Sequence, residues 1–227
     1  MVVPGYTRSS GAYGRYQPMG PELKWKDSSS GTVIVPFGLA AANQLINLVD
    51  LGTGPNQRIG RSITIRHIEV KINMQANWTL PAGAPPTVGN VSYRVDLILD
   101  KQANGAVPAG GDIYDTLIGA VAPENRFPNL LNSDRFVIMK RWEGDLNPPS
   151  IPLTDPVNQQ LTSIGRDLKL SKKCNIRVEL NPSTPTTIAD VRSNNLLLVF
   201  SGSQGQPGAA GVQFLSTCDT RIRFQDS

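Results

Sequence analysis

The stretch VSYRVDLILD, residues 91–100, alternates apolar and polar side chains with a period of two. Its odd positions are all aliphatic or aromatic, whereas its even positions include Arg94, Asp96 and Asp100. A period of two is typical of a β-strand with one buried face and one solvated face. We therefore expect a half-buried strand here, in which Asp96 and Asp100 are solvated carboxylates and not a catalytic pair.

A second strand with the same alternation is expected at residues 168–180. Its apolar side chains occupy even positions, with Lys172 as the exception. Lys169, Lys173 and Arg177 share the opposite face of that strand. This arrangement predicts a half-buried strand with a basic outer face.

The strand signal at residues 63–74 changes phase along its length. Ile63 and Ile65 occupy odd positions, but the apolar residues after His67 occupy even ones. A slip of one residue predicts a β-bulge or a bend near His67. An almost continuous apolar run at 196–200 predicts a strand that is buried on both faces. Further strands are expected at 135–142, 195–201 and 212–224.

Turn-rich stretches separate these strands, and 21 glycines and 18 prolines leave room for few long helices. Long loops between seven or eight antiparallel strands favour a β-sandwich, and a jelly roll places such loops at the ends of its two sheets. The turn-rich stretches are 81–90, 102–111, 147–156, 181–185 and 202–211, and short helix signals lie at 39–49, 112–118 and 156–164.

The composition argues against most metal and catalytic sites. A single histidine, His67, is too little for a histidine-based triad or metal site. Cys174 and Cys218 form no CxxC pair, and we expect both to be reduced thiols. The glycine-rich stretch 54–62 has five residues between its glycines, where a phosphate loop has four. We expect no catalytic residue, no metal and no cofactor.

Residues 1–20 are rich in Gly, Tyr, Ser and Arg, so we expect a flexible arm before a single domain at 21–227. The arm and the start of the domain interleave cations with aromatic rings, a composition suited to phosphate pairing and base stacking. A solvated tail without a ligand fits the composition equally well. No long apolar run indicates a membrane partner or a secretory signal. The nucleic-acid candidates in this region are Arg8, Tyr13, Arg15, Tyr16, Lys24, Trp25 and Lys26.

Four blocks of the chain point to a known family when they are taken in order. They are NLVDLGTGPNQRIGRSITIRHI at 47–68, RVDLILDKQANGAVP at 94–108, NLLNSDRFVIMK at 129–140 and IADVRSNNLLLV at 188–199. Their succession resembles the capsid proteins of circovirus-like viruses, within the circular Rep-encoding single-stranded DNA (CRESS-DNA) group. The ending RIRFQD at 221–226 is also similar to that family.

This resemblance implies an all-β fold, an eight-stranded antiparallel jelly-roll sandwich with long loops and an interior N-terminal arm. It also implies a structural protein and not an enzyme, of which about sixty copies close into a T=1 icosahedral shell around circular single-stranded DNA. The implied partners are other copies of the chain, single-stranded DNA or non-specific nucleic acid, and an unknown host receptor. The implied locations are the virion and, during assembly, the host nucleus or cytoplasm.

The charge of the chain departs from that family. The formal net charge is only +4, and residues 1–20 carry two arginines, whereas such capsids typically open with an arginine-rich arm. About sixty copies would supply about 240 charges against on the order of a thousand phosphates. Basic side chains of the wall would then contribute, although surface or inter-subunit salt bridges are the alternative role for them. These further candidates are Arg58, Arg61, Lys169, Lys173 and Arg177.

A rival interpretation is a secreted or surface β-sandwich that binds a carbohydrate or a receptor, such as a lectin or adhesin. Such a module is expected to carry a secretory signal, disulfides or clustered acidic calcium ligands. The sequence contains none of these signals.

Overall fold

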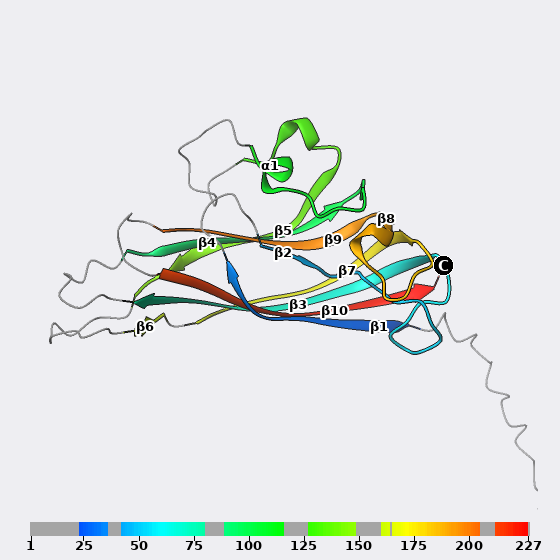
Figure 1. Cartoon of the computed structure of the whole chain (residues 1–227), viewed down its shortest axis with the longest axis horizontal. Helices are drawn as coiled ribbons and strands as arrows, with labels where there is room; N and C mark the ends of the chain where they lie inside the picture. Colours follow the sequence, from blue (N-terminus) through cyan, green and yellow to red (C-terminus); the bar gives the residue numbers. More distant parts are fainter. Residues whose placement is uncertain are drawn as a thin grey trace, which may run out of the picture.

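The computed structural model describes residues 23–35, 42–79, 89–115, 127–148, 160–163, 165–204 and 212–226. These residues form two antiparallel β-sheets that stack face to face (Figure 1). The prediction of an all-β, sandwich-like fold is therefore confirmed. No helix in the described part of the chain has the length and apolar character needed to cross a membrane.

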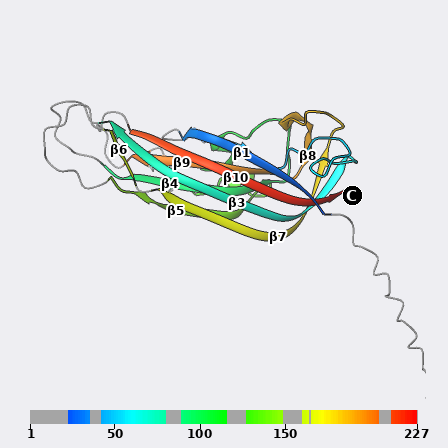
Figure 2. The ribbon, with the colours of Figure 1, turned by 90° about the horizontal axis from the view of Figure 1, so that it is seen from below.

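The larger sheet has the strand order β1-β10-β3-β7-β8, and β6 also pairs with β3. Figure 2 shows β1, β10, β3 and β7 lying side by side in this order. Long strands in the centre give this sheet an extended surface on the side that faces away from its partner. Its strands are β1 (Lys24–Val35), β3 (Ser62–Thr79), β6 (Gln160–Thr162), β7 (Arg166–Leu180), β8 (Val191–Ser193) and β10 (Val212–Asp226).

The smaller sheet has the strand order β2-β9-β4-β5. Its two central strands pair along their whole length, from Val91 opposite Gln204 to Asp100 opposite Asn195. Its strands are β2 (Ala42–Leu45), β4 (Val91–Asp100), β5 (Phe136–Leu146) and β9 (Asn195–Gln204).

The main hydrophobic core fills the space between the two sheets. Alternate side chains of β3 and β10 point into it, and Trp78, Phe214 and Phe224 are among its largest fully buried members. Val95 and Leu97 of β4 enter from the smaller sheet. The apolar residues that the period-two pattern predicted to be buried thus lie on the inner faces of the two sheets.

A third layer covers the outer face of the smaller sheet. It consists of the described parts of the connection between β4 and β5, residues 101–115 and 127–135, which we call the cover segment (Figure 1). Ile113 and Tyr114 of this segment are buried in a second, smaller cluster with Leu197 and Val199 of β9. The cover segment contains α1 (Gly110–Ile113) and a 3-10 turn (Leu130–Asn132), and a further 3-10 turn (Ile188–Asp190) precedes β8.

The cover segment changes the environment of β4 and β9. The prediction that β9 is buried on both faces is confirmed, because Leu196, Leu198 and Phe200 face the main core while Leu197 and Val199 face the cover segment. The prediction that β4 is half-exposed was wrong. Its phase was right, but its charged face lies under the cover segment.

The predicted irregularity in β3 is confirmed. Ile65 pairs with Phe224 of β10 and His67 pairs with Arg223, so Arg66 is one extra residue on β3 at this point. The pairing with β7 also shifts here, between Ile65 and His67. A bulge of this kind lets Ile63 and Ile65 face the core on odd positions while the residues after it do so on even ones.

Two helix signals were wrong within the described residues. Residues 42–45 form β2 and not a helix. The next residue, Ile46, continues the pairing with β9, because its amide donates to the Leu196 carbonyl at 3.0 Å. Ile46 and Val49 have helix-like spacing, but an extended chain buries both of them. Residues 160–162 form β6, and the third signal corresponds only to the short α1.

Strand β1 has no counterpart in the sequence-based predictions. Its outward-facing positions include Trp25 and Ile34, and its register against β10 shifts between Ser29 and Thr32. Gly31 lies at this shift with φ +61°, a backbone conformation that glycine adopts without strain.

Candidate nucleic-acid and assembly surfaces

The outer face of the larger sheet gathers several of the predicted basic residues. Strand pairing aligns Trp25 of β1, Arg223 of β10, His67 of β3 and Lys173 of β7 in one row across the sheet. The chain positions of this row differ by up to nearly 200 residues, and only the antiparallel pairing brings them together. We call this surface the outer face.

Ion pairs neutralise part of the outer face. Arg221 donates to both carboxylate oxygens of Asp27, at 2.6 and 2.7 Å, and Arg223 donates to Glu69 at 3.0 Å. The hydrogen bond from Arg221 lowers the pKa of the Asp27 carboxyl below its usual value. These arginines therefore belong to salt bridges within the sheet, the alternative role considered for basic wall residues.

Strand β7 carries three further cations of the outer face, and Lys71 of β3 lies opposite Lys169. Lys169 and Lys173 are exposed and make no ion pair among the described residues. Arg177 lies 3.8 Å from Glu179, and the arginine side chain is 67 % exposed. Successive cations lie four residues apart, which corresponds to about 13 Å along a strand. The predicted basic face of residues 168–180 is therefore present, in the phase that the sequence indicated.

The candidates near the arm separate in the structure. Trp25 is 46 % exposed on the outer face, whereas Lys24 is buried and forms a 2.7 Å ion pair with Asp226. Lys26 faces Asp50, with its ammonium 3.5 Å from the carboxylate. The alternation of β1 thus places the two lysines on the side opposite to the tryptophan. The other four candidates, Arg8, Tyr13, Arg15 and Tyr16, lie outside the described residues.

Arg58 does not reach a surface. Its side chain is fully buried, with Nε donating to the Val49 carbonyl at 2.9 Å. Its two terminal nitrogens donate to the carbonyls of Gly60 and Asn181. Burial lowers the pKa of this guanidinium, although nearby carboxylates oppose that shift. The arrangement is that of a buried arginine which ties together two loops.

Arg61 and Arg177 lie together in one surface hollow. Arg192 lines the same hollow, and so do Glu179 and Asn181. The sequence pattern did not indicate Arg192, because it belongs to the three-residue strand β8 and is separated from Arg61 by more than a hundred residues. Only the pairing of β7 with both β3 and β8 reveals the cluster.

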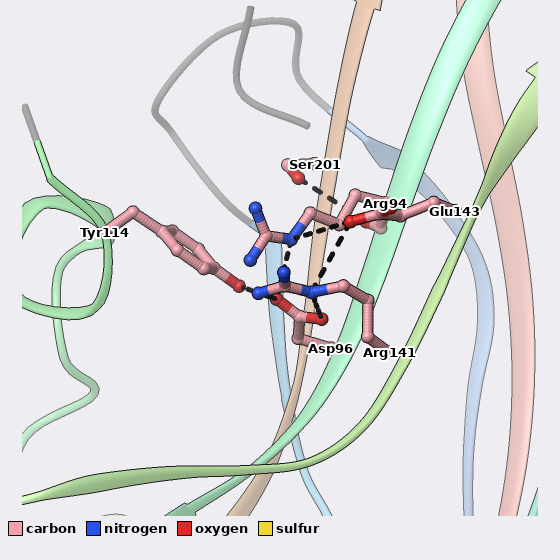
Figure 3. A network of polar contacts seen from close by, with 6 residues as sticks. All are labelled: Arg94, Asp96, Tyr114, Arg141, Glu143 and Ser201. Carbon is pink, nitrogen blue, oxygen red and sulfur yellow. Dashed lines mark hydrogen bonds and ion pairs between the residues drawn. The ribbon is translucent and has the colours of Figure 1, made fainter. Parts of the chain in front are cut away.

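A buried charge network lies between β4, β5 and the cover segment (Figure 3). Asp96, at 0 % exposure, accepts hydrogen bonds from Arg94 Nε at 2.8 Å, Arg141 Nε at 2.9 Å and the Tyr114 hydroxyl at 2.6 Å. The Arg94 guanidinium also lies 4.4 Å from the centre of the Tyr114 ring. Burial raises the pKa of Asp96 above its usual value, while Arg94 and Tyr114 oppose that shift.

Asp100 anchors the other end of the cover segment. Arg135 donates to both of its oxygens at 2.8 Å, and the Gln102 amide donates to it at 3.1 Å. The hydrogen bond to Asp100 raises the pKa of Arg135. Asp96 and Asp100 are thus both fully buried and fully engaged with donors. The prediction that they are solvated was wrong, and their role is to hold the cover segment on the sheet.

The cover segment carries a cluster of exposed apolar side chains. Phe127, Leu130 and Leu131 are 69 %, 82 % and 92 % exposed, within five residues of one another. Asn129 caps the start of the 3-10 turn that bears the two leucines, and its side chain accepts from the Leu131 amide at 3.0 Å. We call this cluster the apolar tip. Exposed clusters of this kind mark surfaces that contact another molecule.

Two comparisons with known proteins found no match for this chain. No protein-family description matches it, and no curated protein matches it. Within the described residues, no group of three or more His, Cys, Asp or Glu side chains is placed to hold a metal ion. Cys174 and Cys218 are free thiols, as expected from their spacing.

Proposed function

We propose that this protein is a viral capsid subunit whose copies assemble into a small closed shell around circular single-stranded DNA. The proposal includes a jelly-roll fold, a T=1 shell of about sixty copies and a location in the virion and, during assembly, in the host nucleus or cytoplasm. It rests on the four sequence blocks, on the strand order and on two surfaces of the molecule.

Strand order supports the jelly roll. Without the two three-residue strands, the remaining eight strands, renumbered along the chain, lie in the orders 1-8-3-6 and 2-7-4-5. Each of the strand pairs 1·8, 2·7, 3·6 and 4·5 is hydrogen-bonded. A long four-pair hairpin that is rolled into two sheets has this order. Viral capsid domains and lectins both use it, so the choice between them depends on the surfaces.

The apolar tip is the observation that carries the assembly proposal. Its three large side chains are held outward on a segment that two buried carboxylates fasten to the sheet. A rigid apolar cluster gains free energy when a partner removes it from water, and little ordering entropy opposes the contact. A sugar-binding site would instead need a concave set of polar groups and aromatic rings, whereas this tip consists of exposed, mainly aliphatic side chains.

The cations of β7 support binding of the genome. Lys169, Lys173 and Arg177 share an exposed face and, together with Trp25 on the same sheet, combine charge with an aromatic ring. Single-stranded nucleic acid is bound by this combination without dependence on base sequence.

The decisive experiment is size-exclusion chromatography followed by negative-stain microscopy of the purified chain. We expect closed particles near the megadalton scale, with an absorbance ratio at 260 and 280 nm that indicates nucleic acid. A monodisperse monomer or dimer across a range of salt and pH would overturn the assembly proposal. Binding of the monomer to a defined glycan in the same preparation would instead favour the lectin or adhesin interpretation.

A further inference from the structure

The hollow at the junction of β3, β7 and β8 is a basic concave surface. Arg61, Arg177 and Arg192 line it, and Glu179 is the only acidic side chain in its lining. The glutamate and Arg177 are both more than half exposed at a separation of 3.8 Å, so water weakens their pairing. Three arginines and one glutamate give the hollow a formal charge of +2.

Hydrogen bonds hold the backbone of Arg61 and of Arg177 and the side chain of Arg192. The Leu180 amide donates to the Arg61 carbonyl at 2.8 Å, and the Asn194 side chain donates to the Arg177 carbonyl at 2.7 Å. Arg192 Nε donates to Asn181 Oδ1 at 2.6 Å. Because these backbone positions are already held, a ligand would need to order mainly the side chains.

The buried Arg58 extends this support. Its guanidinium donates to the backbone carbonyl of Asn181, the residue whose side chain positions Arg192. Arg58 was a nucleic-acid candidate on sequence grounds, but in the structure it contacts the hollow only indirectly, through Asn181. It acts as a positioning residue for the loop that shapes the hollow.

The chemistry of the hollow is that of an oxyanion site. Guanidinium groups bind tetrahedral oxyanions through paired N–H donors, and arginine is favoured over lysine where such geometry matters. Along β7, the hollow is continuous with Lys173 and Lys169 on the outer face. A single site for a small anion would not need this continuation, whereas a chain of phosphates would follow it.

We propose that the hollow is a phosphate-binding site for the backbone of single-stranded nucleic acid, and that it forms the end of a basic track along β7. This inference deepens the proposed function and rests on it. Arg61, Arg177 and Arg192 contact one phosphate, and Lys173 and Lys169 contact later ones. The site reads charge and spacing, so base sequence does not affect its affinity.

The test measures binding of fluorescent oligo(dT) by anisotropy, for the full-length chain and for Arg61→Gln/Arg192→Gln. Arg166→Gln is the matched control, because this exposed arginine lies at the other end of β7 and outside the hollow. We expect at least tenfold weaker binding for the double variant and a shallower salt dependence, by about 0.7 per lost phosphate contact. The control should change affinity less than threefold.

Thermal melting of each variant verifies that the fold is intact, and microscopy records assembly separately. Unchanged oligo(dT) affinity in a folded double variant overturns the phosphate site while leaving the shell proposal in place. Inorganic phosphate that binds as tightly as the oligonucleotide, or a sulfated glycan that binds more tightly, also overturns it. Loss of particles in the wild-type chain would instead be a failure of the proposed function itself.

Discussion

Asp96 holds three strong donors where water does not reach. A buried carboxylate is costly to desolvate, and the two arginines and Tyr114 offset that cost only while all of them are in place. Removing the charge of Asp96 leaves Arg94 and Arg141 with the half-exposed Glu143, 3.9 and 3.5 Å from them, as their nearby counter-charge, and water weakens that pairing. The members of the network therefore depend on one another, because a substitution that removes one charged group leaves another buried charge without its full set of partners.

We predict that Asp96→Asn lowers the free energy of unfolding by about 3 kcal/mol. Asp134→Asn in the same cover segment is the control, because Asp134 is exposed and has no ion pair among the described residues. Chemical denaturation of the two variants measures the difference. Equal stability of both variants would mean that the network does not hold the cover segment.

Cys218 is a thiol that the core protects. Burial raises its pKa to about 12, so at pH 8 only about one molecule in ten thousand carries the thiolate. The folded state favours the neutral thiol, so the stability contributed by this group is present below the unfolded pKa near 9. That contribution is lost as the pH rises from 9 toward 12.

We predict that Cys218 does not react with iodoacetamide at pH 8 in the native protein and reacts readily in denaturant. Mass spectrometry of the alkylated peptides measures this. The half-buried Cys174, whose pKa is also raised by burial, is the internal comparison and should react first. Fast native labelling of Cys218 would contradict the burial of β10 in the core.

At the scale of the elements, strand phase was predictable and strand environment was not. The alternation in β4 and β7 and the slip in β3 all follow from local periodicity, and the structure contains each of them. The burial of Asp96 depends on the cover segment, and the sequence of that segment has no periodicity that predicts its packing on β4. Strand β1 was missed because its serine-rich middle has no apolar alternation, and its partner β10 lies almost two hundred residues away.

The candidate site shows the same division. The basic face of β7 is a property of one strand, so its residues could be predicted from the sequence alone. The hollow with Arg61, Arg177 and Arg192 combines three elements, and no local pattern relates them. Lys24 and Trp25 were grouped as neighbours in the chain, but a strand places adjacent side chains on opposite faces.

Gly202 sets the distance between β9 and β10 across the core. A Cβ atom at this position would lie 2.8 Å from Phe214 Cδ1, and Phe214 is fully buried. We predict that Gly202→Ala lowers the free energy of unfolding by about 1–3 kcal/mol through overpacking. Denaturant unfolding measures this cost. In a Phe214→Leu background the same substitution should cost much less, and an unchanged cost would place the strain elsewhere.

At the scale of the whole molecule, the buried ion pairs hold the cover segment on the sheet, and the cover segment in turn presents the apolar tip. We predict that Phe127→Ser/Leu131→Ser keeps the melting temperature of the subunit but abolishes closed particles. Ile59→Ser is the matched control, since Ile59 is 65 % exposed on a different loop. Analytical ultracentrifugation separates subunits from shells, and normal assembly of the double variant would remove the tip from the interface.

The modest charge of +4 leads to a further prediction on the genome. We expect that deletion of residues 1–20 lowers the nucleic-acid content of assembled particles and does not abolish it, because the β7 cations remain. The absorbance ratio at 260 and 280 nm of purified particles measures this content. Unchanged content after the deletion would mean that Arg8, Tyr13, Arg15 and Tyr16 do not contribute to packaging.

The shift at Gly31 concerns the rim of the larger sheet. Within the described residues β1 pairs with no strand other than β10, and on its other side the Trp25 amide donates to the Pro55 carbonyl at 3.3 Å. The rest of that side forms no ladder with a described strand, so an approaching strand could pair there. Gly31, in the left-handed conformation, lies where the register of β1 and β10 shifts after six paired residues. A straight incoming strand cannot follow β1 past this irregularity. The irregular edge of β1 therefore disfavours fibre growth by strand pairing between copies of the chain. In the proposed shell many copies come together at high local concentration, and an irregular rim would then favour discrete contacts over continuous sheet pairing.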